Sequence, residues 1–310
     1  MRSQWPNGNP ARRRRFSTRV GAALGAAFIA VQVAPALAQA PGAVPPFKLA
    51  REGYTLTKSD AEAIEASLKS APDDLAARTR LLGFYFRSAT RVYPIEVAIE
   101  ARRRHILWLI AQHPESEASA LSEATIDAKG HALADPIGFE QAAAAWTEQA
   151  RRDATDVRVL SHAANFFRLS DKERAVSLLR QAQVVDPGNR EWQARIGYAY
   201  ALAILGVDMV NQNGLPTSHN PAEAKSAFAL RAIDALKASP DAAVVGVAGS
   251  IIGKYGLVLN AVSRGSFSVD HATLSEAFLT RAQQLDPANP HWASELAELR
   301  KLRAMANQSK

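Results

Sequence analysis

Apolar residues recur at helical spacing along most of the chain from about residue 59 onward. The clearest case is the segment 172–185, whose apolar positions follow the i, i+3, i+4, i+7 spacing of one helix face: Ala175, Leu178, Leu179, Ala182 and Val185. Asp171 precedes this segment and is expected to cap it. Alternating β-branched runs bounded by hairpin turns are missing. The pattern therefore predicts an all-α fold.

The chain also resembles itself at a separation of 100 residues. The matching positions are Asp186 and Asp286, Asn189 and Asn289, and Trp192 and Trp292. In both copies proline follows the aspartate, where it cannot continue one helix but suits the first turn of the next. Similar turns between helices begin further units at Pro72, Pro114, Ala154 and Pro240. Each unit is expected to be a pair of helices.

Residues 154–189 resemble one unit of the tetratricopeptide-repeat family. The matching residues are the small Ala163 and Ala164 with Phe167 in the first helix, then Ala175, Leu179 and Ala182 in the second. The run from Trp192 to Tyr200 is similar to the family's Trp-Leu-Gly-Tyr pattern, with one extra residue after the tryptophan. The resemblance covers roughly residues 60–305. It implies a right-handed α-solenoid of about six helix pairs that holds a protein or peptide partner.

Most units are longer than the family period of about 34 residues. The excess lies between the two helices of a unit, and insertions at this position are expected to gather on one edge of the stack. Three insertions carry one histidine each, namely His131, His219 and His271. Together with Asp135 and Asp270 they would form a metal or acid–base site. An enzyme, or a metal- or ligand-binding protein, is therefore the alternative function.

The first helices of the units are expected to form the binding face. Asn165 lies near the position where carboxylate-clamp repeats carry an asparagine, and Arg158 and Arg195 supply cations nearby. The helix expected at 242–252 is apolar, so a full clamp is not recognisable. The insertions at 206–221 and 263–272 are expected to shape one rim of this face. The candidate partner-binding residues are Arg158, Asn165, Arg195, Asn211, Asn213, His219, Arg264 and His271.

Familiar catalytic and metal-binding motifs are absent from the sequence. It has no cysteine and no HExxH motif. His105, in a basic stretch expected to be solvated, and His113, at a helix end, are interpreted as structural. The glycines of GVAGSIIGKYG (residues 246–256) lack the strand of a phosphate loop and are expected to let helices pack closely. We therefore expect neither enzyme activity nor a cofactor.

The formal charge of +7 comes largely from the N-terminus, because six of the 37 basic residues lie in residues 1–38 without an acidic one. The rest of the chain is nearly neutral, which argues against nucleic acid as a partner. The arginines, the apolar run from Val20 to Val33 and the Ala36-x-Ala38 site predict a signal peptide, cleaved after Ala38. Whether export follows the general or the twin-arginine route stays open.

Three segments follow from this pattern. Residues 1–38 are the predicted signal peptide, residues 39–58 a flexible lead-in, and residues 59–310 the helical repeats. The mature chain is expected to be periplasmic or secreted, without a stable membrane span. Its predicted function is that of a scaffold for protein–protein or protein–peptide interaction.

Overall fold

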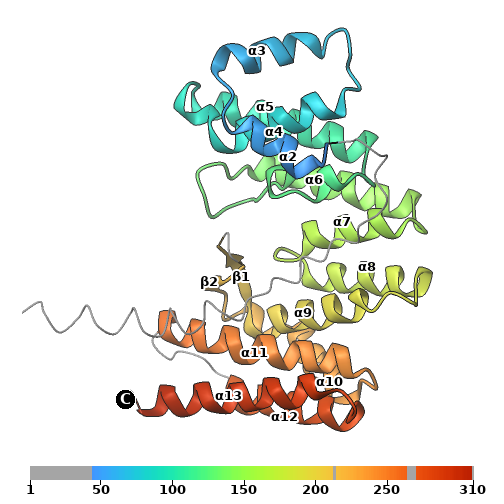
Figure 1. Cartoon of the computed structure of the whole chain (residues 1–310), viewed down its shortest axis with the longest axis vertical. Coiled ribbons are helices and arrows are strands. Elements are labelled where there is room, and N and C mark those ends of the chain that lie inside the picture. Colours follow the sequence, from blue (N-terminus) through green and yellow to red (C-terminus); the bar gives the residue numbers. More distant parts are fainter. Residues whose placement is uncertain (1–43, 212–213, 264–269, 309–310) are drawn as a thin grey trace, which may run out of the picture. The chain divides into compact units, whose positions relative to one another are not determined.

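Helices account for almost all regular structure in the part of the chain that this computed structural model describes, residues 44–211, 214–263 and 270–308 (Figure 1). Residues Val44–Lys310 pack as one unit. The α-helices are α2 (Pro46–Gly53), α3 (Lys58–Ser67), α4 (Leu75–Arg87), α5 (Ile95–Gln112), α6 (Pro136–Arg152), α7 (Val157–Phe167), α8 (Lys172–Val185), α9 (Glu191–Leu205), α10 (Ala227–Ala238), α11 (Ala242–Ser263), α12 (His271–Leu285) and α13 (Pro290–Gln308). The 3-10 turns are η2 (Ala89–Arg91), η3 (Glu117–Ala120), η4 (Ser122–Ala124) and η5 (Glu223–Lys225). The prediction of an all-α fold is confirmed, apart from one small hairpin.

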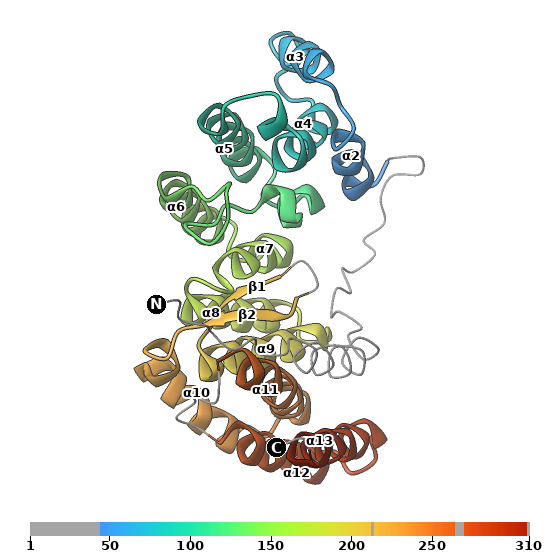
Figure 2. The same ribbon diagram turned by 90° about the vertical axis from the view of Figure 1, so that its left-hand side faces the viewer.

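Helices that follow one another in the sequence pack against one another. Contacts join α4 to α5, α7 to α8, α9 to α10 and α11 to α12 as pairs, and α9 packs against α11 in the next pair. Figure 2 shows the second helices α5, α6, α8 and α10 along one side of the stack. We call α4, α7, α9, α11 and α13 the first helices, and α5, α6, α8, α10 and α12 the second helices.

Short polar side chains begin the helices where the sequence places them. Asp74, Asp156 and Asp171 accept backbone N–H groups at the starts of α4, α7 and α8. Ser226 and Asp270 do the same for α10 and α12. Each satisfies donors that the first helical turn leaves without a partner inside the helix. The predicted cap at Asp171 and the bounds 172–185 are confirmed.

The two halves of the 100-residue similarity have the same local structure. The amides of Asp186 and Asp286 donate to the carbonyls four residues earlier, at 2.8 and 3.0 Å. The side chains of Asn189 and Asn289 then accept the backbone N–H two residues on, at 3.0 and 3.1 Å. Trp192 and Trp292 follow, and both are buried. The same turn therefore joins α8 to α9 and α12 to α13.

The unit that begins at Pro114 departs from the expected helix pair. Two 3-10 turns, η3 and η4, stand where its first helix was expected. Arg102 of α5 is buried and donates hydrogen bonds to the backbone oxygens of Glu123 and Thr125. It thereby satisfies carbonyl groups that this irregular segment cannot pair within itself.

The basic stretch around His105 is solvated only in part, because Arg104 is exposed whereas Arg102 and His105 are buried. His105 is only 1% exposed, and its ring stacks on Tyr85 with centroids 5.8 Å apart. Its Nε2 lies 2.9 Å from Glu65 of α3, and its Nδ1 lies 3.2 Å from the guanidinium of Arg78. Because arginine can only donate, Nδ1 accepts and Nε2–H donates to the carboxylate. The structural interpretation of His105 fits this network.

The predicted flexible lead-in, residues 39–58, is wrong for its second half. Residues 46–53 form α2, which packs closely on α4. A side chain at Gly83 would meet the backbone oxygen of Ala50 at 1.8 Å, so only glycine allows this approach. Residues 1–43, including the predicted signal peptide, lie outside the described residues.

The insertion at 206–221 contains strands that the pattern did not predict. β1 (Val207–Val210) and β2 (Pro216–His219) pair antiparallel, with two irregularities in their register. Figures 1 and 2 place this hairpin beside α9 and α11, which it contacts. The Asn213-Gly214 dipeptide between the strands is a typical hairpin signal. Both strands have only four residues, which is too short for a clear alternating pattern.

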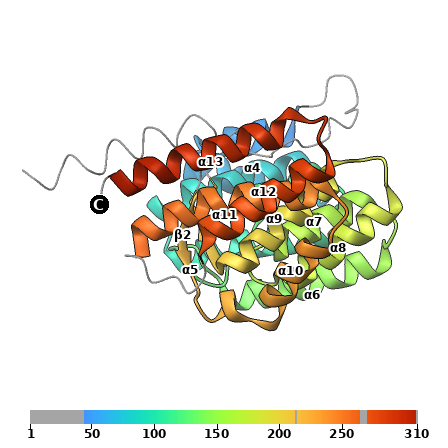
Figure 3. The same cartoon turned by 90° about the horizontal axis from the view of Figure 1, so that it is seen from below.

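The glycines of α11 face the last two helices. A side chain at Gly246 would meet the ring of Trp292 at 2.4 Å, and one at Gly249 would meet Phe278 and Leu279 at 3.0–3.1 Å. Figure 3 shows α11, α12 and α13 side by side, so the expected close packing is confirmed. Residues Ala242–Asn260 are long and apolar enough to span a membrane, with mean hydropathy 1.7. However, 56% of that window is buried inside the protein, as in the core helix of a soluble protein.

Candidate functional site: a cationic and aromatic cluster on the first helices

Arg195 connects α9 to α7. Its Nη2 donates to the backbone oxygen of Ser161 at 2.9 Å, and its Nη1 donates to the Ser161 hydroxyl. The guanidinium carbon lies 5.6 Å from the centre of the Trp192 ring. Burial lowers the pKa of Arg195 to about 10, and the charge of Arg168 acts in the same direction. The side chain is still charged at neutral pH.

Arg168, which the sequence analysis missed, is the C-cap residue of α7. Its Nε is buried and has no hydrogen-bond partner among the described residues. Its charge acts on both Arg195 and Tyr255. A cation at a helix C-terminus is favoured by the helix dipole, and that was the signal available in the sequence.

Tyr198 of α9 and Tyr255 of α11 extend the cluster toward the hairpin. Their rings meet edge to face with centroids 6.2 Å apart, and their hydroxyl oxygens are 3.3 Å apart. Tyr255 donates to the backbone oxygen of Gly214, at the hairpin turn, at 2.5 Å. Because that proton is used, Tyr198 donates to Tyr255 and keeps an oxygen lone pair available. Burial raises the pKa of Tyr255, so its hydroxyl stays protonated near neutral pH.

Arg158 and Asn165 lie on α7, as expected. Arg158 pairs with Asp156 at 3.3 Å, and Asn165 is half-buried one helical turn before Arg168. We define the arginine–tyrosine cluster as Arg158, Arg168, Arg195, Tyr198 and Tyr255. Glu191 lies near Arg195, and burial raises the pKa of the Glu191 carboxyl group. Within the described residues the cluster therefore holds more positive than negative charge.

The insertions gather on one edge, as the repeat pattern predicts. Lys129 forms an ion pair with Asp208 of β1 at 3.5 Å, and Gly130 lies against Met209. On the other side of the hairpin, His219 lies close enough to His271 for its charge to act on that ring. The hairpin therefore links the insertion before α6 to the start of α12.

The three loop histidines do not meet in one site. His131 Nε2 lies 2.9 Å from Asp127, and its Nδ1 accepts the amide of Leu133 at 3.1 Å. His219 and His271 form a separate pair, in which burial lowers the pKa of His271 to about 4. Among the described residues, no three acidic or histidine side chains are grouped as metal ligands.

The two aspartates expected to complete that site cap helices instead. Asp135 accepts the amide of Gly138 at the start of α6 and forms a bidentate pair with Arg103 at 2.6 and 2.7 Å. Asp270 accepts the amide and the hydroxyl of Thr273 at the start of α12. Both carboxylates already have strong donors, so their roles are structural.

Of the remaining candidates, the structure describes Asn211. Asn211 accepts the amide of Leu215 at 3.1 Å through its side chain and so closes the hairpin turn. Asn213 and Arg264 lie outside the described residues.

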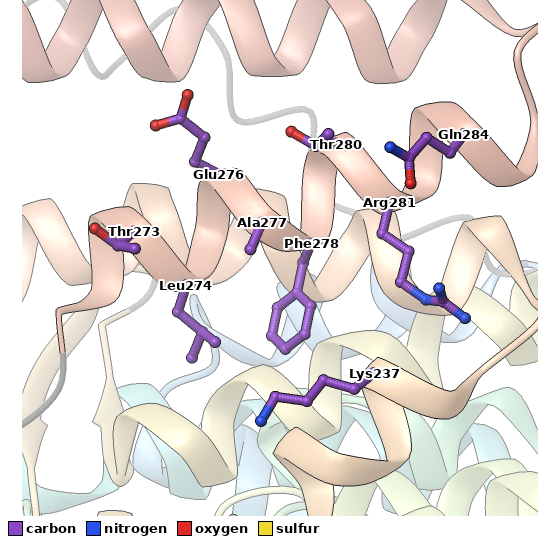
Figure 4. Close-up of a pocket in the computed structure, with 9 residues that line it drawn as sticks. All are labelled: Lys237, Thr273, Leu274, Glu276, Ala277, Phe278, Thr280, Arg281 and Gln284. Carbon is purple, nitrogen blue, oxygen red and sulfur yellow. The ribbon is translucent and has the colours of Figure 1, made fainter.

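A separate shallow groove of about 600 Å³ runs between the second helices α10 and α12 (Figure 4). It is lined by Lys237, Thr273, Leu274, Glu276, Ala277, Phe278, Thr280, Arg281 and Gln284. Neither this groove nor the arginine–tyrosine cluster contains the paired base and nucleophile of a hydrolytic site.

No protein-family model matches this chain, and no curated protein matches it. Any function must therefore be argued from the residues themselves.

Proposed function

We propose that this chain is an exported scaffold, a right-handed solenoid of tetratricopeptide-like helix pairs that binds a protein or peptide segment on its first helices. The observation that carries the proposal is the arginine–tyrosine cluster. Arg168 and Arg195 have no carboxylate ion pair among the described residues, although both are at least half-buried. Arg195 is held by Ser161, whereas the buried Nε of Arg168 has no acceptor among the described residues. A charge removed from water without a partner is costly, so a bound anionic group would stabilise Arg168.

The chemistry of the cluster favours an acidic segment. Arginine binds carboxylates through a planar pair of donors. The Tyr198 hydroxyl, whose proton is used toward Tyr255, offers an acceptor to a donor group of the same segment. Arginine and tyrosine are also the residues that most often dominate the binding energy of interfaces. The cluster spans α7, α9 and α11, so an extended segment would contact three successive helix pairs.

The predicted signal peptide supports the envelope as the site of action. Its basic start, apolar run and Ala-x-Ala site are features of exported precursors. The proposed partner is therefore another exported protein, or the periplasmic part of a membrane protein.

The test uses the mature chain, residues 39–310, as immobilised bait for periplasmic extract. Arg168→Gln is the informative variant, because it removes one charge without removing any hydrogen bond among the described residues. Arg152→Gln, an exposed arginine on α6, is the matched control. A protein that binds the wild type and the control but is lost from the Arg168→Gln bait supports the proposal. A partner retained equally by all three baits places binding elsewhere.

A further inference from the structure

Neighbouring second helices are joined by side-chain bridges along most of the stack. Arg103 of α5 binds Asp135 at the start of α6, and Arg174 of α8 donates to Thr147 of α6 at 3.0 Å. Farther along, Arg231 of α10 binds Glu173 of α8 at 2.7 Å. These bridges close the spaces between consecutive second helices.

The contact between α10 and α12 differs from these side-chain bridges. The contact recorded there runs from Arg281 of α12 to the backbone oxygen of Ser239, the C-cap residue of α10, at 2.9 Å. It lies at one end of the two helices. Arg281 also lines the groove, which extends along most of α12, from Thr273 to Gln284.

The floor of this groove is apolar. Figure 4 shows the Leu274 and Phe278 side chains extending from α12 toward α10, with Lys237 below them. Ala277 is exposed and Leu274 is partly exposed, whereas Phe278 is buried beneath them. Leu230 of α10 is 56% exposed and lies seven residues before Lys237, on the same face of that helix. An exposed apolar strip of this kind marks an interaction surface when polar residues border it.

The border of the groove is cationic. Arg281 has no ion pair with a described carboxylate, and its Nε has no acceptor among the described residues. Lys237 makes one exposed contact with Asp234, at 3.7 Å. Glu276, the acidic residue of the lining, is already bound by Arg300 and Arg303 of α13. A carboxylate entering the groove would therefore meet two cations and no free anion of the lining.

We propose that the groove between α10 and α12 docks a short amphipathic helix of a partner protein, with apolar side chains on Leu274 and Ala277 and a carboxylate beside Lys237 and Arg281. The helix would fill the space that the side-chain bridges occupy elsewhere. Binding of an amphipathic helix in an apolar groove is a known recognition mode, and complementary charges fix its register. This surface is distinct from the arginine–tyrosine cluster, so the scaffold has two docking faces.

The test compares two fluorescein-labelled synthetic peptides by fluorescence anisotropy. Both carry leucines at i, i+3, i+4 and i+7, with glutamates at the other positions in one and lysines in the other. The glutamate peptide should bind the full mature chain about tenfold more tightly than the lysine peptide. Ala277→Glu fills the groove with a carboxylate and should weaken the glutamate peptide by about tenfold or more. Ala144→Glu, at an exposed alanine on α6, is the matched control and should change nothing.

Several results would overturn the proposal. Equal binding of both peptides would show that charge does not contribute to recognition. Unchanged binding by Ala277→Glu would show that the peptide does not lie in the groove. The proposal also fails if the glutamate peptide does not bind at millimolar concentration. Loss of binding in Arg168→Gln but not in Ala277→Glu assigns the peptide to the arginine–tyrosine cluster. Sedimentation that shows self-association abolished by Ala277→Glu makes a second copy of this chain the occupant.

Discussion

The guanidinium of Arg195 on α9 donates to the backbone oxygen of Ser161 on α7, across two successive helix pairs. Arg168, at the end of the same α7, lies near that guanidinium but makes no side-chain hydrogen bond among the described residues. One arginine therefore holds two helices together, whereas the other carries a charge that the fold does not use. Substitution of Arg195 is therefore expected to affect stability, and substitution of Arg168 is expected to affect binding.

Arg195→Gln is expected to destabilise the protein by about 1–3 kcal/mol, because it removes two hydrogen bonds from a charged donor and leaves the Ser161 carbonyl less satisfied. Arg168→Gln is expected to change the free energy of unfolding by less than about 0.5 kcal/mol. Urea denaturation of both variants measures the difference. A loss for Arg168→Gln as large as that for Arg195→Gln would show that Arg168 is structural.

Acid is expected to destabilise the network of Glu65 and His105. Burial opposes ionisation of Glu65, but His105, Tyr85 and Arg104 together lower its pKa to about 2. Burial also lowers the pKa of His105, although Glu65 opposes this. Both groups bind protons more readily in the unfolded chain, so stability is lost as pH falls from about 6.5 toward 2.

The measurement is the urea midpoint between pH 7.5 and pH 3.5. In His105→Gln the loss between about pH 6.5 and 5 should shrink, while the loss below pH 4.5 should persist until Glu65 is also replaced by Gln. A wild-type midpoint that does not change between pH 7 and pH 4 would contradict the buried network.

Gly246→Ala is expected to cost about 1–3 kcal/mol, because the new methyl group would overlap the Trp292 ring. Alanine is the better helix former by about 1 kcal/mol, so propensity alone predicts the opposite sign. Gly188→Ala is the control, since nothing lies within 4 Å of its added carbon. Thermal unfolding of both variants gives the comparison. A stabilised Gly246→Ala would mean that α11 and α13 are not in contact.

Tyr255→Phe is expected to loosen the hairpin at a cost of about 1 kcal/mol, because it removes the hydrogen bond to Gly214. Amide hydrogen exchange should become faster in β1 and β2 and stay unchanged in α8. Uniformly faster exchange over all helices would point to global destabilisation instead.

Mass spectrometry of the exported protein is expected to give a mature chain that begins at Gln39. Replacing Arg13 and Arg14 with lysines distinguishes the two export routes, because the twin-arginine route depends on that pair. Export that continues in this variant favours the general route. A full-length chain retained in the cytoplasm would refute the predicted signal peptide.

The pattern of residues by itself determined most of the helices, the bounds of α8 and the turn repeated at Asp186 and Asp286. These features depend on neighbours within a few positions, such as Asp171 three residues before the amide that it caps, or Asn189 beside the start of α9. Periodicity and capping are local properties of the chain, so they can be read without a structure.

Tertiary structure alone decided which side chains meet. Glu65 and His105 are 40 residues apart, and Arg102 reaches carbonyls in a segment where a helix was expected. His131 pairs with Asp127, whereas Asp135 and Asp270 cap helices, so the loop histidines do not share one site. In the same way, only packing shows that Arg195 is held by Ser161 while Arg168 is not. Such pairings depend on how distant helices approach one another, and helical spacing carries no information about that distance.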